Sequence, residues 1–238
     1  MDQPYPSAAA TAKAFGDVVS PAKVEFFNRL GIDLVMGDRR GARFQDAFTG
    51  RWYYNCHSNG GVFNLGHRNE AVAQALRSGL DELDVGNHHL ISGWRSVLGD
   101  RLLNTLDDKL AKVVFTTSGS EAVDAVIKAA RGKTGRTKVV SIEGAWHGGT
   151  GFAYSASDPS YRVPFGPDLA GFAQVPFDDL PAMERAIDDD TALVLVEPIP
   201  ATLGMPVASD GYFQGVAELC SEAGVMLAFD EVQTGLGR

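Results

Sequence analysis

The sequence predicts an α/β protein whose mostly parallel sheet carries helices on both faces. From residue 112 onward, short apolar runs alternate with stretches of helical periodicity. Parallel strands must be joined by crossover connections, usually helices, so this alternation indicates a parallel sheet. The runs at 192–196 and 225–229 contain no charged residue, which is typical of strands covered on both faces. Glycine makes up 27 of 238 residues and often follows such a run, which indicates strand-end loops that approach another group closely.

Residues 1–60 are predicted to form an N-terminal segment. Residues 1–20 are small and polar, which favours a loosely ordered tail. Between Val24 and Tyr54, apolar stretches alternate with turn signals such as Gly31, so we expect a helix followed by two or three short strands.

Residues 61–238 are predicted to form the large domain. Its first helix follows Asn69, a candidate N-cap, because Val72, Leu76 and Leu80 recur every four residues. The further elements expected are a helix at about 93–106 with Val97, Leu98, Leu102 and Leu103 facing inward, strands at 112–116, 138–142, 172–175, 193–196 and 225–229, and helices at 121–131, 180–187 and 211–223.

Composition and charge exclude several classes of protein. With 21 basic and 30 acidic residues the formal net charge is −9, which argues against nucleic acid or a membrane as partner, because both select basic surfaces. Cys56 and Cys220 are too few for a disulfide framework or a cysteine-rich zinc site. Residues 1–15 lack a signal-peptide pattern, and no apolar run could span a bilayer. We therefore expect a soluble, cytoplasmic protein.

The end of the predicted strand at 112–116 carries a helix start. Ser118 and Glu121 have the spacing of a capping box, and small residues around them leave backbone N–H groups open. The helix dipole adds partial positive charge there, so this turn is a candidate phosphate seat. The alternative is an ordinary capped helix.

Three later strand ends carry side chains suited to a planar ligand. Trp146 and His147, flanked by glycines, could present a flat face, although such a pair is also common as packing plus a surface histidine. Glu197 follows an apolar strand directly and could be a solvated charge. Asp230 ends a strand that looks buried, where a carboxylate is costly unless a cation or strong donor pairs with it. A protonated pyridine nitrogen would be such a partner.

Three other sites are not expected. The run 132–134 resembles the end of a P-loop, but Ile127 replaces the required earlier glycine and a helix precedes the run. No serine lies in a nucleophile-elbow pattern. A metal site at His88 and His89 is not expected, because adjacent side chains point apart and no carboxylate accompanies them.

Together these strand ends resemble the class III aminotransferases of the fold type I pyridoxal-phosphate enzymes. That group includes acetylornithine, ornithine, 4-aminobutyrate and other ω-amino transaminases. The resemblance runs from about Asp46 to Arg238. It rests on the motifs at 117–122, 146–148 and 197–198, on Asp-Glu-Val-Gln-Thr-Gly at 230–235, and on Asn64-Leu65-Gly66-His67 ahead of the first large-domain helix. It implies that residues 1–60 begin the small domain and that 61–238 form an incomplete cofactor-binding domain.

The resemblance implies a site for pyridoxal 5'-phosphate. Gly119 and Ser120 would hold its phosphate, and Asp230 would pair with the pyridinium nitrogen so that the ring can accept electrons. The other implied contacts are Trp146 on one face of the ring, Val232 on the other, His147 beside it, Gln233 toward the phenolic oxygen, and Glu197 near that side, where it would help gate substrate choice. Gly86 to Leu90 would shape the substrate entrance.

Two positions depart from the family pattern. Tyrosine or phenylalanine is commoner at Trp146. The Glu-Pro pair at 197–198 usually precedes a segment rich in glutamine and glycine, whereas this chain has Pro200-Ala201-Thr202-Leu203. This replacement leaves the role of Glu197 open.

The family's Schiff-base lysine lies beyond the hexapeptide, and none of this chain's lysines matches it. Three readings follow: a truncated enzyme, which we favour; one half of a split enzyme; or a degenerate binding protein. The expected activity is transfer of an amino group from an amine or amino acid to a 2-oxo acid by a homodimer, or with a complementing C-terminal half. On its own, the chain is expected to be inactive. The rivals are an aminomutase or decarboxylase of the same fold, and a non-catalytic subunit.

Overall fold

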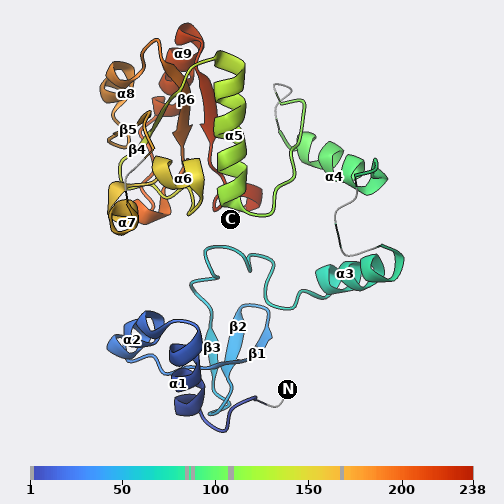
Figure 1. Ribbon diagram of the computed structural model, residues 1–238. Coiled ribbons are helices and arrows are strands. Elements are labelled where there is room, and N and C mark those ends of the chain that lie inside the picture. The colour runs from blue at the N-terminus through green and yellow to red at the C-terminus, as the bar shows by residue number, and fades with distance from the viewer. Residues whose placement is uncertain (1–2, 84–85, 87–88, 107–109, 167–168, 238) are drawn as a thin grey trace. The chain divides into compact units, whose positions relative to one another are not determined.

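A computed structural model describes residues 3–83, 86, 89–106, 110–166 and 169–237 (Figure 1). The chain divides into two compact units, Met1–His89 and Leu90–Arg238, and each is described here by itself. The domain boundary predicted between residues 60 and 61 stays a prediction.

The first unit begins with two helices, α1 (Ala8–Val18) and α2 (Pro21–Arg29), which pack against each other. The expected loose tail over residues 1–20 is therefore wrong for α1. Three consecutive alanines favour the helix, and the Ser7 hydroxyl caps it by accepting a hydrogen bond of 3.1 Å from the Ala10 N–H. The small residues that suggested a tail lose little side-chain conformational entropy when they become helical.

The two or three short strands predicted here are present as β1 (Met36–Arg40), β2 (Arg43–Asp46) and β3 (Trp52–Tyr54). They form an antiparallel sheet in chain order. Buried Asp46 ends β2 and accepts hydrogen bonds from the Val35 N–H at 3.1 Å and the Thr49 N–H at 2.9 Å. Burial alone would raise the pKa of Asp46, but these bonds and one from the Thr49 hydroxyl outweigh it, so the pKa lies below its usual range.

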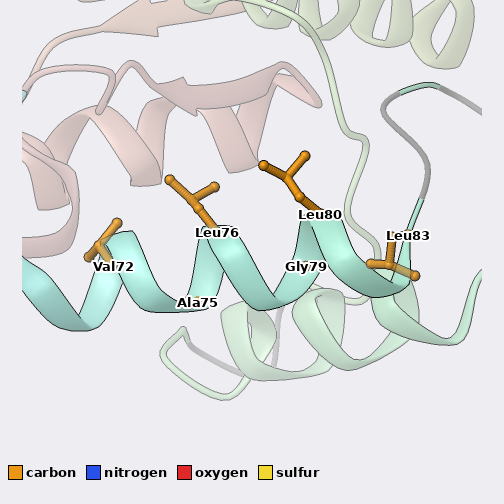
Figure 2. Close-up of a pocket in the computed structure, with 6 residues that line it drawn as sticks. All are labelled: Val72, Ala75, Leu76, Gly79, Leu80 and Leu83. Carbon is orange, nitrogen blue, oxygen red and sulfur yellow. The ribbon is translucent and has the colours of Figure 1, made fainter.

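Helix α3 (Glu70–Glu82) completes the first unit, and its predicted N-cap is confirmed because the Asn69 side chain accepts a hydrogen bond of 3.2 Å from the Val72 N–H. Figure 2 shows Val72, Leu76 and Leu80 on one side of the helix, with Leu83 beyond its end. All four side chains are exposed, and they line a shallow hollow of about 450 Å³. The predicted periodicity is real, but no described residue buries this face.

The second unit begins with two helices, and from β4 onward its strands are separated by helices (Figure 1). No described helix has both the length and the apolar character needed to cross a bilayer. The elements in chain order are α4 (Gly93–Leu103), α5 (Gly119–Thr134), β4 (Lys138–Ile142), α6 (Gly151–Ala156), α7 (Pro159–Arg162), η1 (Val163–Phe165), β5 (Phe172–Val175), α8 (Leu180–Ala186), β6 (Thr191–Val196), η2 (Ala201–Leu203), α9 (Tyr212–Ala223), β7 (Met226–Phe229) and η3 (Gly235–Gly237).

The sheet of this unit has the order β5-β4-β6-β7, and all of its described pairings are parallel. Its strands send alternate side chains to opposite faces. Val194 and Val196 of β6 join the apolar cluster under α8 and α9, whereas Leu193 and Leu195 join the cluster under α5 and α6. Helices therefore bury both faces of the sheet, which confirms the predicted α/β class.

Two predictions for the start of this unit are wrong. Residues 112–116 are not a strand in the structure, and Val114 is 76% exposed. A strand needs a neighbour for its backbone hydrogen bonds, and the described residues pair β7 only with β6 and give 112–116 no partner strand. In α4, Val97 and Leu98 are exposed rather than inward-facing, because no described element covers them.

Candidate functional site

The carboxyl ends of β4, β6 and β7 lie at one edge of the parallel sheet, where ligands bind in open α/β folds. The segment 144–150 follows β4, Glu197 follows β6 and Asp230 follows β7. Helix α5 begins at Gly119 beside them, as the contacts below establish. The predicted site residues thus come from four separate segments of the second unit.

The start of α5 is capped as the sequence predicts, with one difference. The Ser118 hydroxyl accepts a hydrogen bond of 3.2 Å from the Glu121 N–H. In a capping box the Glu121 carboxylate would reach back to the Ser118 N–H, but here it accepts from the Thr117 N–H at 2.7 Å and from the Thr117 hydroxyl. These bonds hold the pKa of Glu121 below its usual range. The turn at 117–121 is fixed by its own side chains.

The loop after β4 lies against the first turn of α5. A Cβ atom added to Gly148 would lie 2.4 Å from the Ser120 Oγ, and φ of Gly148 is +133°, so only glycine fits this approach. The Gly149 N–H donates to the Ser120 Oγ at 3.2 Å. Since the hydroxyl accepts that bond, its own proton is left to donate to another acceptor.

The segment after β7 also reaches α5. A Cβ atom added to Gly119 would lie 2.9 Å from both γ-methyl groups of Val232. The Val232 N–H donates to the Asp230 Oδ1 at 3.1 Å. Val232 therefore connects Asp230 to the helix start, and Gln233 lies half-buried in the turn that follows.

His147 and Asp230 form a buried pair at the centre of the site. Nδ1 of His147 lies 2.8 Å from Oδ2 of Asp230, and the side chains are 0% and 6% exposed. The His147 N–H donates to the Ser157 hydroxyl at 2.9 Å, and the Asp230 N–H donates to the Val196 carbonyl at 2.7 Å. Nε2 of His147 is buried and has no hydrogen-bond partner in the described part of the chain.

Trp146, the residue before His147, is bonded to Glu197. The Trp146 N–H donates to the Glu197 Oε1 at 3.1 Å. Burial raises the pKa of Glu197, and Asp230 adds to this effect, while His147 and the Trp146 N–H oppose it. Trp146 is 43% exposed, and its ring packs edge-on with Tyr161, with ring centroids 5.0 Å apart.

Sequence reasoning missed several residues that support the site. Ser157 and Thr202 hold the backbone of the loop after β4, and Asp158 holds it through the Gly144 N–H at 2.8 Å. Only Asp158 carried a local signal, because an aspartate before Pro159 is a typical N-cap. The expected entrance segment 86–90 includes Asn87 and His88, which lie outside the described residues.

The arrangement suits a planar cation that carries an anionic arm. The start of α5 offers N–H groups and the Ser120 hydroxyl to an anion. Asp230 offers a carboxylate whose second oxygen is already held by His147, and the exposed Trp146 ring offers an aromatic face. A phosphorylated pyridine derivative has this combination of groups.

Comparison with known proteins also points to an enzyme that uses such a group. Residues 29–238 match the sequence profile of the family described as aminotransferase class-III. An uncharacterized aminotransferase from Archaeoglobus fulgidus is 50% identical over 230 residues, which are 97% of this chain and 54% of the relative. An acetylornithine aminotransferase from Methanopyrus kandleri is 36% identical over 223 residues, or 93% and 57%. The chain spans about half the length of these curated relatives.

Solved structures agree with the sequence comparison. A crystal structure of an ornithine aminotransferase from Toxoplasma gondii ME49 superimposes with a TM-score of 0.87 at 25% identity, covering 98% of this chain and 55% of that one. A second T. gondii structure, described with partial occupancy of pyridoxal phosphate at its active site, gives a TM-score of 0.86 at 25% identity, covering 97% and 54%.

Proposed function

Because the chain belongs to the class III aminotransferases, a family dependent on pyridoxal phosphate, we propose that it supplies the cofactor site of a transaminase. The reaction moves an amino group from an amine or amino acid to a 2-oxo acid. One observation carries the proposal. Val232 contacts Gly119 at the start of α5 and donates its N–H to Asp230. The candidate phosphate site and the Asp230 carboxylate therefore both lie next to Val232.

The two ends of the site have different roles. Gly119 and Ser120 would hold the cofactor phosphate through backbone N–H groups and the proton of the Ser120 hydroxyl. Asp230 would accept a charge-assisted hydrogen bond from the protonated pyridine nitrogen. When bound, pyridoxal phosphate supplies an electron sink for the electrons released at the substrate carbon. The chain's own part is to hold the ring and keep its nitrogen protonated.

His147 keeps Asp230 ready for this role. An ionised carboxylate only accepts hydrogen bonds, so Nδ1 of His147 carries the proton in their 2.8 Å contact. The contact also holds the Asp230 carboxylate in place, with its other oxygen accepting the Val232 N–H. Trp146 and Val232 would cover the two faces of the ring, and Gln233 would reach its phenolic oxygen.

The transfer requires groups beyond those in this chain. None of the lysines at 13, 23, 109, 112, 128, 133 and 138 matches the family's cofactor lysine. The relatives are about twice as long as this chain. We therefore propose that the lysine, and the segments that close over the substrate, correspond to the part of the relatives that this chain does not cover. They would belong to the same chain or to a partner. The relatives named for acetylornithine and ornithine favour ω-amino acids as donors.

Equilibrium binding of pyridoxal phosphate to the 238-residue chain tests the proposal. We expect saturable binding that weakens about tenfold or more in Asp230→Asn and in Ser120→Ala, because each removes a bond to a charged group. Pyridoxal, which lacks the phosphate, should bind more weakly than pyridoxal phosphate and should lose its sensitivity to Ser120→Ala. Binding unchanged by both substitutions would overturn the assignment of the two ends.

A further inference from the structure

We propose that residues 197–203, named the 197–203 clamp, set the position of the Trp146 ring, with Glu197 and Thr202 as positioning residues. This inference rests on the proposed function, because it gives Trp146 a bound ring to face. It assigns Glu197 a role other than gating the substrate. It also uses the Pro200–Leu203 segment, where the sequence departs from the family pattern.

The clamp touches the loop after β4 at three points. The Glu197 Oε1 accepts the Trp146 N–H at 3.1 Å. The Thr202 hydroxyl donates to the Gly144 carbonyl at 2.6 Å, which is short for such a bond. A Cβ atom added to Gly144 would lie 2.2 Å from a methyl group of Leu203, so the two segments are in close contact. The backbone on the N-terminal side of the Trp146 ring is therefore held from the end of β6.

The surroundings of Glu197 fit a holding role better than a gating one. The residue is 8% exposed, and its carboxylate faces the Trp146 N–H, His147 and Asp230. Among the described residues, no lysine or arginine forms an ion pair with it. A carboxylate that gates a substrate must exchange partners, and this one is buried against a backbone donor.

The Trp146 ring gains its orientation from this anchoring. The ring packs edge-on with Tyr161, and Trp146 is 43% exposed. No hydrogen bond from the indole fixes it in the described structure, so the backbone and Tyr161 decide where the open face points. Loss of the clamp would let the loop shift and widen the range of ring positions.

Fluorescence of Trp146 tests the clamp without any cofactor. A Trp52→Phe, Trp94→Phe background leaves Trp146 as the only tryptophan of the chain. In this background we expect Thr202→Val and Glu197→Ala to raise acrylamide quenching of Trp146 about twofold, because each removes one anchor. Glu197→Gln should restore the original quenching, since the amide oxygen still accepts the Trp146 N–H. Thr105→Val is the matched control, because Thr105 donates to the Leu102 carbonyl in α4, outside these contacts.

Cofactor binding by the same variants gives the second readout. Thr202→Val and Glu197→Ala should weaken pyridoxal phosphate binding about five- to tenfold. Glu197→Gln should weaken it less than Glu197→Ala, and Thr105→Val should leave it unchanged. If Glu197→Ala does not fold, Thr202→Val carries the test alone. Quenching unchanged in Thr202→Val, with an intact far-ultraviolet circular dichroism spectrum, would overturn the clamp. Absence of cofactor binding in the parent chain would overturn the proposed function while leaving the quenching result to decide the clamp.

Discussion

Nδ1 of His147 lies 2.8 Å from Oδ2 of Asp230, although 83 residues separate the two in the chain. The contact exists because β4 and β7 are parallel strands of one sheet, joined through β6, and both end at the same edge. It joins two strand-end residues into one buried, hydrogen-bonded pair.

Replacing His147 by leucine should destabilise the chain by about 1–3 kcal/mol, because it leaves one oxygen of a buried carboxylate without its side-chain donor. Urea denaturation of the whole chain, followed by circular dichroism, measures the change. His147→Asn should recover part of the loss, since its amide can donate. The control is His57→Leu at an exposed position, which should have little effect. Equal stability of His147→Leu and the parent would contradict the role given to the pair.

Gly148→Ala should destabilise the chain by about 2 kcal/mol or more and reduce pyridoxal phosphate binding, because the added methyl group meets Ser120 and the backbone has φ of +133°. Gly149→Ala is a matched control, since a Cβ atom there meets nothing within 4 Å. Thermal unfolding and equilibrium dialysis report the two effects. Similar losses in both variants would show that the Ser120 contact is not the cause.

Asp46 should make the first unit sensitive to acid. Its folded pKa lies below the unfolded value of about 3.8, so it contributes stability above that pH, and the contribution is lost as the pH falls through the folded pKa. Asp46→Asn should cost about 1–3 kcal/mol at pH 7, and the difference from the parent should shrink below pH 4. Urea titrations at several pH values measure this. A difference that stays constant down to pH 2 would argue against the hydrogen-bond cause.

Leu195→Ala should lower the free energy of unfolding by about 2–5 kcal/mol, because Leu195 is buried between the sheet and α5. Met226→Ala on the exposed start of β7 should cost much less, since it opens no buried cavity. Guanidinium denaturation of both variants provides the comparison. If the two costs were equal, the core would not lie where the sheet and α5 meet.

The two cysteines should react at very different rates. Burial raises the pKa of Cys220 to about 11, whereas Cys56 is exposed. At pH 8 a disulfide reagent should modify one thiol of the folded chain quickly and the second only after unfolding. Cys56→Ser should remove the fast phase, and Cys220→Ser should leave it. Two fast thiols in the folded protein would mean that α9 opens readily.

The parts of the fold that the sequence predicted best are those decided by local patterns. The limits of β4 and β5 match the prediction, and α8, α9 and β6 match within two residues. Residues 112–116 have an equally apolar pattern, but strand formation needs a partner that local sequence does not specify. The helix α1 was missed because small residues suit both a tail and a helix, and capping by Ser7 decides between them.

In the candidate site, too, local patterns predicted some features and contacts between distant segments decided the others. The positions of Ser118, Glu197 and Asp230 at element ends followed from apolar runs and turn chemistry. Their partners did not, because pairing between segments depends on sheet order. Nothing local indicates that Glu121 bonds the Thr117 N–H, that Thr202 reaches Gly144, or that Gly148 leaves no room beside Ser120.

Strand β7 has consequences for how the chain behaves at high concentration. In the described structure it pairs on one side only, and Met226 and Phe229 are both 43% exposed. An edge strand with open N–H and C=O groups and apolar side chains is a template for adding further strands. The chain should therefore self-associate through this edge as it is concentrated, and a lysine introduced at Met226 should delay that association.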